Sequence, residues 1–256
     1  PDPATDTWAS LQLTDVATDT ATTRRLLDQV DAAGIELRDF LLAALTMTIT
    51  SWRVARSQPA THGALIALEG HGREDGLVGE AVDTSATVGW FTSVFPVRLG
   101  AGERPVDVEG AVGNPAVARA LLRSVSDHLA AVPNRGLDFG LLRYHRRDPG
   151  LADARHPQLE FNFIGRHDLG ARGSAAEGTA WSLITDPTLN GALPTAPEPK
   201  LALRYTFDVI SVVNGTDAGP QLLTSWRWSD RLTSSAEAAA LADLWSRALR
   251  ALGDAL

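Results

Sequence analysis

Apolar residues at helical spacing are the clearest pattern along this chain. They predict four helices, at about residues 20–33, 37–56, 106–131 and 234–252. The second of these stretches is apolar on most faces over its first half, so we expect it to be buried. Ser234 and Glu237 match the S-x-x-E capping box, which predicts that the last helix begins there.

Strand patterns lie between these helices. The continuous apolar run Ala64–Leu68 is typical of a buried strand, and further strands are expected at residues 92–99, 158–164, 180–185, 201–213 and 221–228. Pro96 favours an edge position or a bulge for its strand. The last two strands are expected to form a hairpin around Asn214 and Gly215.

Strands mixed with long helices, in no strict alternation, predict an α/β (α+β) layered sandwich in which a mixed sheet is packed with helices. No internal repeat and no long interior linker marks a second domain, so residues 1–256 are expected to form one unit. The polar, glycine-rich residues 165–178 predict a loop, which is either a lid or a simple connection.

Composition narrows the function classes. The chain has 256 residues, is 44% apolar and carries a net charge of −8, which fits a soluble globule and argues against a nucleic-acid partner. No apolar run is long enough to span a bilayer, so no membrane association is expected. The absence of cysteine excludes disulfides and a cysteine nucleophile, and it fits a cytoplasmic protein. The start at Pro1 lacks both an initiator Met and a signal peptide, so we expect a piece of a longer polypeptide.

The hexapeptide Glu69–Glu74, with the sequence Glu-Gly-His-Gly-Arg-Glu, carries the most informative candidate chemistry. It places Glu69 where a buried strand gives way to a glycine-punctuated loop. A carboxylate there can be partly desolvated, which would raise its pKa and make it a usable acid or base near neutral pH. The residues alone also fit a plainer interpretation, in which Glu69 ends a strand and pairs with Arg73 in a charged turn.

Other common sites lack their motifs. The chain has no G-x-x-x-x-G-K-[ST] phosphate loop and no G-x-S-x-G elbow, and the glycines after Glu69 do not complete G-x-G-x-x-G. The histidines are scattered, without H-E-x-x-H spacing. His71 with Glu69, Glu74 and Asp75 would make a poor metal cage, because alternating loop residues do not converge, so no metal is expected.

Five segments taken together resemble the epimerization domains of non-ribosomal peptide synthetases, which are related to the condensation domains of the same machines. In chain order they are Asp39–Ala44, Glu69–Glu74, Thr87–Pro96, Pro133–Gly140 and Phe161–Gly165. The third segment is specific for the superfamily, and the second distinguishes epimerization members from ordinary condensation members. The resemblance spans about half of the chain in the family's order.

The resemblance implies a fold similar to chloramphenicol acetyltransferase, with two lobes meeting in a V and the active site in a tunnel between them. The N-terminal lobe of the family normally carries a His-His-x-x-x-Asp-Gly motif, but no two histidines are adjacent in this chain. The chain is therefore expected to be the C-terminal lobe only, with the N-terminal lobe absent.

The implied reaction inverts the α-carbon of an aminoacyl or peptidyl thioester on the phosphopantetheine arm of a peptidyl carrier protein, and no cofactor binds the lobe directly. A proton leaves one face of the carbon and another returns on the opposite face, so two acid/base groups are needed. Glu69 is the candidate for one, and a histidine of the absent lobe for the other. Asn162 can offer a donor and an acceptor to the enolate or to Glu69, although a strand-edge polar role fits it equally well.

The resemblance also places candidate substrate-binding residues. Trp90 and Phe91, followed by Thr92, fall in a loop between the lobes and are expected to form the floor of the tunnel. Without the resemblance, the two aromatic residues would be interpreted as core packing.

Three further residues lie next to these groups in the sequence or in the motifs. His71 either orients Glu69 by a hydrogen bond or belongs to an ordinary loop. Glu74 is expected to be structural, either paired or solvated. Phe163 stands at a substrate-binding position where the family often has Tyr, so a hydroxyl contact is lost there.

Two classes of function stay open. The chain is either the C-terminal half of an active epimerase, or a non-catalytic, degenerate lobe that binds a carrier protein or a neighbouring domain. Condensation itself is disfavoured, because condensation members do not usually carry the Glu69 motif. The expected partners are a peptidyl carrier protein, the missing N-terminal lobe and neighbouring synthetase domains.

Overall fold

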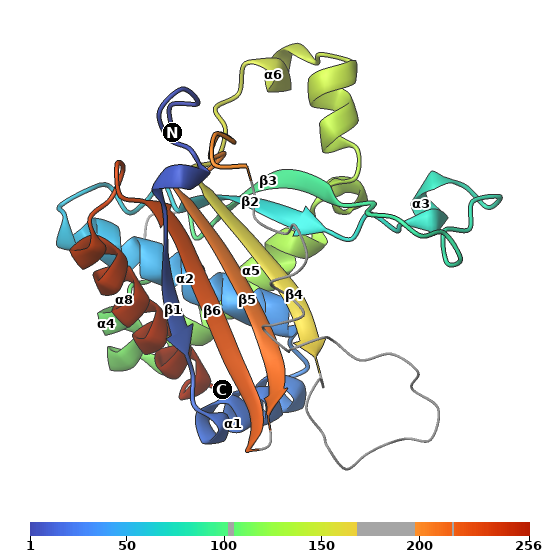
Figure 1. The fold of residues 1–256 in the computed structure, drawn as a ribbon. Coiled ribbons are helices and arrows are strands. Elements are labelled where there is room, and N and C mark those ends of the chain that lie inside the picture. Colours follow the sequence, from blue (N-terminus) through green and yellow to red (C-terminus); the bar gives the residue numbers. More distant parts are fainter. Residues whose placement is uncertain (102–104, 168–197, 217) are drawn as a thin grey trace.

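The computed structural model describes residues 1–101, 105–167, 198–216 and 218–256. Within them, one sheet has the strand order β1-β6-β5-β4-β2-β3 (Figure 1). The strands are β1 Leu11–Ala17, β2 Ala64–Gly70, β3 Ser93–Leu99, β4 Leu159–His167, β5 Phe207–Thr216 and β6 Gly219–Ser229. Strand β4 runs parallel to both β2 and β5, and the other neighbouring pairs are antiparallel. The predicted mixed sheet is confirmed.

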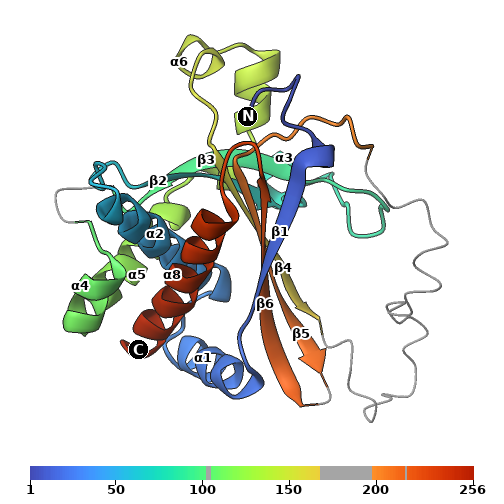
Figure 2. The same ribbon diagram turned by 60° about the vertical axis from the view of Figure 1, so that its left-hand side comes forward.

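Helices cover one face of this sheet, and in the described part of the chain the opposite face carries none (Figure 2). The covering helices are α1 Thr20–Ala32, α2 Leu37–Ala55, α4 Val108–Gly113, α5 Pro115–Ala130 and α8 Ser235–Gly253. The short helices α3 Asp75–Val78 and α6 Pro149–Ala152 lie away from this layer (Figure 1). The predicted layered α+β architecture is therefore confirmed, and the face without a helix among the described residues is called the open face below.

The core lies between the sheet and the helix layer. Phe40, Leu41 and Leu42 in the first half of α2 are fully buried, as the apolar pattern predicts. Trp226 of β6 meets Trp245 of α8 edge to face, with ring centroids 6.3 Å apart. Such aromatic pairs add about 1 kcal/mol to the area they bury, so this contact helps to fix α8 on the sheet.

Two sequence signals are confirmed in detail. Pro96 lies in β3, which is an edge strand, where a residue without a backbone N–H is tolerated. The side chains of Ser234 and Glu237 accept each other's backbone N–H groups, so the predicted capping box begins α8.

The C-terminal hairpin is present, but its turn lies later than predicted. Asn214 and Gly215 are paired within the hairpin, and the chain turns between Thr216 and Gly219. Strand β5 also begins later than expected, at Phe207.

The other differences have local causes. The helix predicted over residues 106–131 divides at Asn114, because Pro115 cannot continue the hydrogen bonding of α4 and instead starts α5 with Asn114 as its N-cap. Strand β1 was not predicted, because its alternation of apolar and polar residues is weak. In the structure its Leu13 is exposed. Of the predicted loop at residues 165–178, the first three residues belong to β4; the others, and the strand predicted at 180–185, lie outside the described residues.

Across the described residues, no helix combines the length and the apolarity needed to cross a bilayer.

Candidate active site

The parallel pairing of β2 with β4 brings Glu69 and Asn162 together. Leu68 is the register partner of Phe161, and both side chains are buried in the core. Successive side chains of a strand point to opposite faces of the sheet, so Glu69 and Asn162 both lie on the open face. The amide Nδ2 of Asn162 donates a hydrogen bond to Oε2 of Glu69. A hydrogen bond to a carboxylate is among the stronger ones in proteins, so this contact fixes the orientation of the carboxylate.

Glu69 is only half-buried and lies at the end of its strand, where a substrate on the open face can reach it. Of the roles left open for Asn162, the structure shows the contact with Glu69, and the part of both residues in catalysis stays a prediction. The alternative pairing of Glu69 with Arg73 is wrong, because the Arg73 guanidinium contacts the loop that follows.

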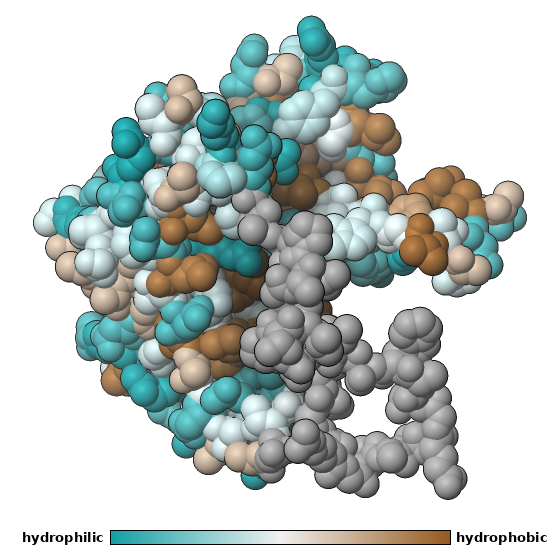
Figure 3. Space-filling model, in the orientation of Figure 1, coloured by the Kyte–Doolittle hydropathy of each residue, from teal (hydrophilic) through white to brown (hydrophobic). Residues whose placement is uncertain are grey.

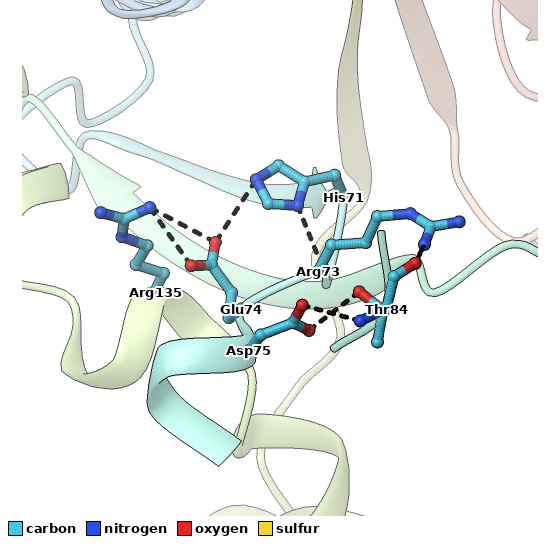
Figure 4. Close-up of polar contacts among 6 residues, drawn as sticks. All are labelled: His71, Arg73, Glu74, Asp75, Thr84 and Arg135. Atoms are coloured by element: carbon cyan, nitrogen blue, oxygen red, sulfur yellow. Dashed lines mark hydrogen bonds and ion pairs between the residues drawn. The ribbon is translucent and has the colours of Figure 1, made fainter. Parts of the chain in front are cut away.

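The loop after β2 holds its own charge network (Figure 4). Nε2 of His71 lies 3.5 Å from Oε1 of Glu74, and Nη1 of Arg135 lies 3.2 Å from Oε2 of the same carboxylate. Nδ1 of His71 accepts the backbone N–H of Arg73 at 3.0 Å. His71 therefore turns toward Glu74, and the prediction that it orients Glu69 is not supported. The structural role expected for Glu74 is confirmed.

Arg73 organises residues 71–92, which include α3 and project from the body of the molecule (Figure 1). Its guanidinium donates to the carbonyl oxygens of Thr84, Thr87 and Gly89, and it stacks over the Phe91 ring at 4.5 Å. One planar fork thus joins three separate points of the loop, a geometry that arginine offers and lysine does not.

The candidate tunnel residues lie on this projecting segment. Trp90 is 98% exposed, Phe91 is 37% exposed and Thr92 is exposed as well. The interpretation of Trp90 as a core residue is therefore wrong. Apolar side chains gather on the segment in the space-filling view (Figure 3), and Val88 near Trp90 is fully exposed. Their role as the floor of a tunnel stays a prediction.

Phe163 differs from the expectation. It packs against the hydrophobic core, whereas its neighbour Asn162 lies on the open face with Glu69. The Phe163 ring therefore contributes to packing, and its role in substrate binding stays a prediction.

The sequence reasoning missed a set of charged residues next to Glu69. Glu160 on β4 is the register partner of Asp208 on β5, which is in turn the partner of Arg227 on β6. These three residues, with Arg204 and Tyr205, line a pocket of about 440 Å³ on the open face. A signal was present, since Glu160 and Asp208 each stand between two large apolar residues, in Leu159–Phe161 and in Phe207–Val209.

These carboxyl groups titrate abnormally. Burial, with the nearby charges of Asp208 and Glu69, raises the pKa of Glu160 to about 8. Burial also raises the pKa of Asp208 above its usual range, although the Arg227 guanidinium opposes that shift. The pKa of Tyr205 is raised to about 12, mainly by burial and secondly by the charge of Glu160. Perturbed groups of this kind gather at functional sites.

A metal site is not formed by these groups. Over the part of the chain that the structure describes, no set of three histidine, aspartate or glutamate side chains is arranged to hold a metal ion.

Comparisons with known proteins define the class. The Condensation domain family matches residues 2–180 of this chain. A linear gramicidin synthase of Brevibacillus parabrevis is 34% identical over 254 residues, which cover 98% of this chain. Chondramide synthase cmdD of Chondromyces crocatus is 38% identical over 167 residues, which cover 64% of this chain. The chain spans 4% of the length of each of these two synthases.

Solved structures show the same fold. The crystal structure of the epimerization domain from the third module of tyrocidine synthetase B has a TM-score of 0.74 at 24% identity, and the match covers 98% of this chain and 49% of that one. The X-domain of teicoplanin biosynthesis, in its complex with OxyB, has a TM-score of 0.57 at 18% identity, and the match covers 96% of this chain and 45% of that one. With the family match, these similarities establish that the chain belongs to the condensation-domain family.

Proposed function

We propose that this chain is the C-terminal lobe of an epimerization domain, which inverts the α-carbon (L to D) of an aminoacyl or peptidyl thioester on a carrier protein. The observation that carries the proposal is the Asn162–Glu69 hydrogen bond at the open end of β2. A half-buried carboxylate with a fixed orientation is suited to exchange a proton with a substrate on the open face. The Glu-Gly-His-Gly-Arg-Glu segment favours epimerization over condensation.

In this mechanism a base on one face of the α-carbon takes its proton, and the electron pair moves into the thioester enolate. An acid on the other face then gives a proton to the same carbon, which inverts it. Glu69 is one of these two groups. Asn162 keeps a second amide hydrogen that can donate to the enolate oxygen.

The second acid/base group would be a histidine of an N-terminal lobe. The match to 49% of the tyrocidine epimerization-domain chain supports a two-lobe arrangement in which this chain supplies one half. The exposed apolar residues Val88 and Trp90 fit a surface that such a partner covers. The carrier protein would bring the thioester on its phosphopantetheine arm, with no cofactor bound by the lobe itself, and neighbouring synthetase domains would supply and remove the peptide.

The test is solvent deuterium incorporation at the α-carbon of an aminoacyl thioester loaded on its carrier protein. It is run with this chain alone, with the N-terminal lobe supplied, and with Glu69→Gln in the two-lobe assembly. Glu80→Gln is the matched control, because Glu80 is an exposed carboxylate outside the sheet, between α3 and β3.

Exchange that needs both lobes, is abolished by Glu69→Gln and survives Glu80→Gln supports the proposal. No exchange in a folded two-lobe assembly contradicts it, and retained carrier-protein binding would then identify a non-catalytic docking lobe.

A further inference from the structure

A row of charged side chains crosses the open face of the sheet. Glu160, Asp208 and Arg227 are successive register partners on β4, β5 and β6. On β2 the register partner of Glu160 is Ala67, so Glu69, two positions further along, lies on the same face and diagonally next to Glu160. The row therefore passes from the candidate acid/base group into the pocket that Glu160, Asp208 and Arg227 line.

The charges in this row are not balanced equally. Nη1 of Arg227 lies 3.5 Å from Oδ2 of Asp208, so Asp208 has a counter-ion. Within the described residues, no ion pair engages Glu160. Arg204 favours the charged form of Glu160, but burial and the two neighbouring carboxylates outweigh it. Tyr205, a further titratable group beside Glu160, has its pKa raised to about 12 and is therefore neutral near pH 7.

Three carboxyl groups in one half-buried cluster cannot all be ionised without strong repulsion. Since Asp208 is paired with Arg227, Glu160 is the member that keeps a proton near neutral pH. A protonated carboxyl group is a hydrogen-bond donor, whereas an ionised one only accepts.

We propose that Glu160 is a positioning residue for Glu69: as a neutral acid, it donates a hydrogen bond to the Glu69 carboxylate, which the amide of Asn162 also holds. Two donors from the same face of β4 then fix the carboxylate at the end of β2. The role in the reaction rests on the proposed function, but the contact between the two carboxyl groups does not.

The contact can be tested without any activity. In the 256-residue chain, labelled with ¹³C at the glutamate side-chain carboxyl carbons, one resonance is expected to titrate near pH 8 and to vanish in Glu160→Gln. In Glu69→Gln its midpoint is expected to fall by about one unit, because a neighbouring negative charge has been removed. Glu80→Gln should leave the midpoint unchanged.

Absence of a resonance titrating well above the ordinary glutamate range would overturn the proposal, as would a midpoint that Glu69→Gln does not move. The Glu69→Gln spectra decide this question even if replacing Glu160 prevents folding.

The positioning role has its own readout in the two-lobe assembly. Ionisation of Glu160 removes a donor from Glu69 and adds a like charge beside it, so wild-type deuterium exchange should fall as the pH rises through about 8. Glu160→Gln keeps a neutral donor and should retain the rate at pH 7 within about threefold, but it should lose this alkaline decline. Glu160→Leu, which has no donor, should be slower by about tenfold at pH 7.

An unchanged alkaline decline in Glu160→Gln would overturn the positioning role. If the wild-type assembly shows no exchange at all, the proposed function fails, while the titration of the isolated chain still decides whether Glu160 and Glu69 are coupled.

Discussion

Asn162 donates its side-chain amide hydrogen to the carboxylate of Glu69, although 93 positions separate the two residues in the sequence. The parallel pairing of β2 with β4 creates this contact, because it places the residues after Leu68 and Phe161 on one face of the sheet. The candidate acid/base group therefore depends on a strand far from it in the chain.

Replacing Asn162 should impair proton exchange without unfolding the chain. Asn162→Ala removes the donor and should lower the rate of deuterium exchange by about tenfold or more. Asn162→Asp puts a like charge against Glu69 and should be the slower variant. The side chain lies on the open face, so thermal unfolding of Asn162→Ala should remain close to wild type, whereas the added carboxylate of Asn162→Asp should lower the unfolding temperature. Equal rates for wild type and Asn162→Ala would contradict the role given to this contact.

Loss of the Arg73 guanidinium should loosen residues 71–92 while leaving the core intact. Arg73→Ala removes the contacts with three carbonyl groups and the stacking on Phe91, and Arg73→Lys should not restore them, because an ammonium lacks the planar fork. Hydrogen–deuterium exchange should rise within this segment only. Arg123 on α5 is exposed, so Arg123→Ala is the control and should leave the exchange unchanged. If Arg73→Ala protects the segment as well as wild type does, Arg73 does not hold the segment in place.

Gly72 permits the close approach of the loop to Phe91. It has φ of +66°, and an added Cβ would lie 1.7 Å from the carbonyl oxygen of Phe91. Gly72→Ala should therefore displace Phe91, and the backbone resonances of residues 89–93 should shift. Gly76→Ala is the matched control, because a Cβ there meets no atom within 4 Å. Unshifted resonances in Gly72→Ala would show that the loop tolerates a side chain at this position.

The protonated state of Glu160 should give the protein a measurable pH dependence. Its pKa is raised from 4.5 to about 8, so between these values the folded state holds a proton that the unfolded state has released. The contribution of Glu160 to the free energy of unfolding is therefore greatest below about pH 4.5, falls as the pH rises and levels off above about 8. After discounting for partial solvent exposure, the loss is on the order of 1–2 kcal/mol.

Urea unfolding of wild type and Glu160→Gln at several pH values between about 5 and 9 measures this effect. Wild type should lose stability relative to the variant across the range, because only wild type carries the titrating group. A constant difference between the two curves would show that Glu160 titrates alike in the folded and unfolded states.

Much of the fold could be predicted from the sequence, because local patterns specify it. The buried first half of α2 follows from its apolar run, the start of α8 from Ser234 and Glu237, and the edge position of β3 from Pro96. Each of these signals acts over a few residues, so a single stretch of sequence is enough to read it. Strand β1 lacks such a signal, since its pairing with β6 rather than its own apolar content makes it a strand.

The site was predicted only in part. Glu69 and Asn162 could be named as candidates, but the sequence left the partner of His71 open, and the structure gives it to Glu74. Glu160 was missed, because a single carboxylate in a strand looks ordinary until the neighbouring strand is known.

The long helices, most of the strands, the mixed α+β class and the motif that marks Glu69 all follow from the amino-acid order alone. Folding in three dimensions adds which side chains share the open face of the sheet, and hence that Asn162 and Glu160 both adjoin Glu69. The two kinds of information differ in range. Helix periodicity, capping and proline effects act between residues a few positions apart, whereas the hydrogen bond and the charge repulsion at this site act across strands, and strand order and register are set by the packing of the whole chain.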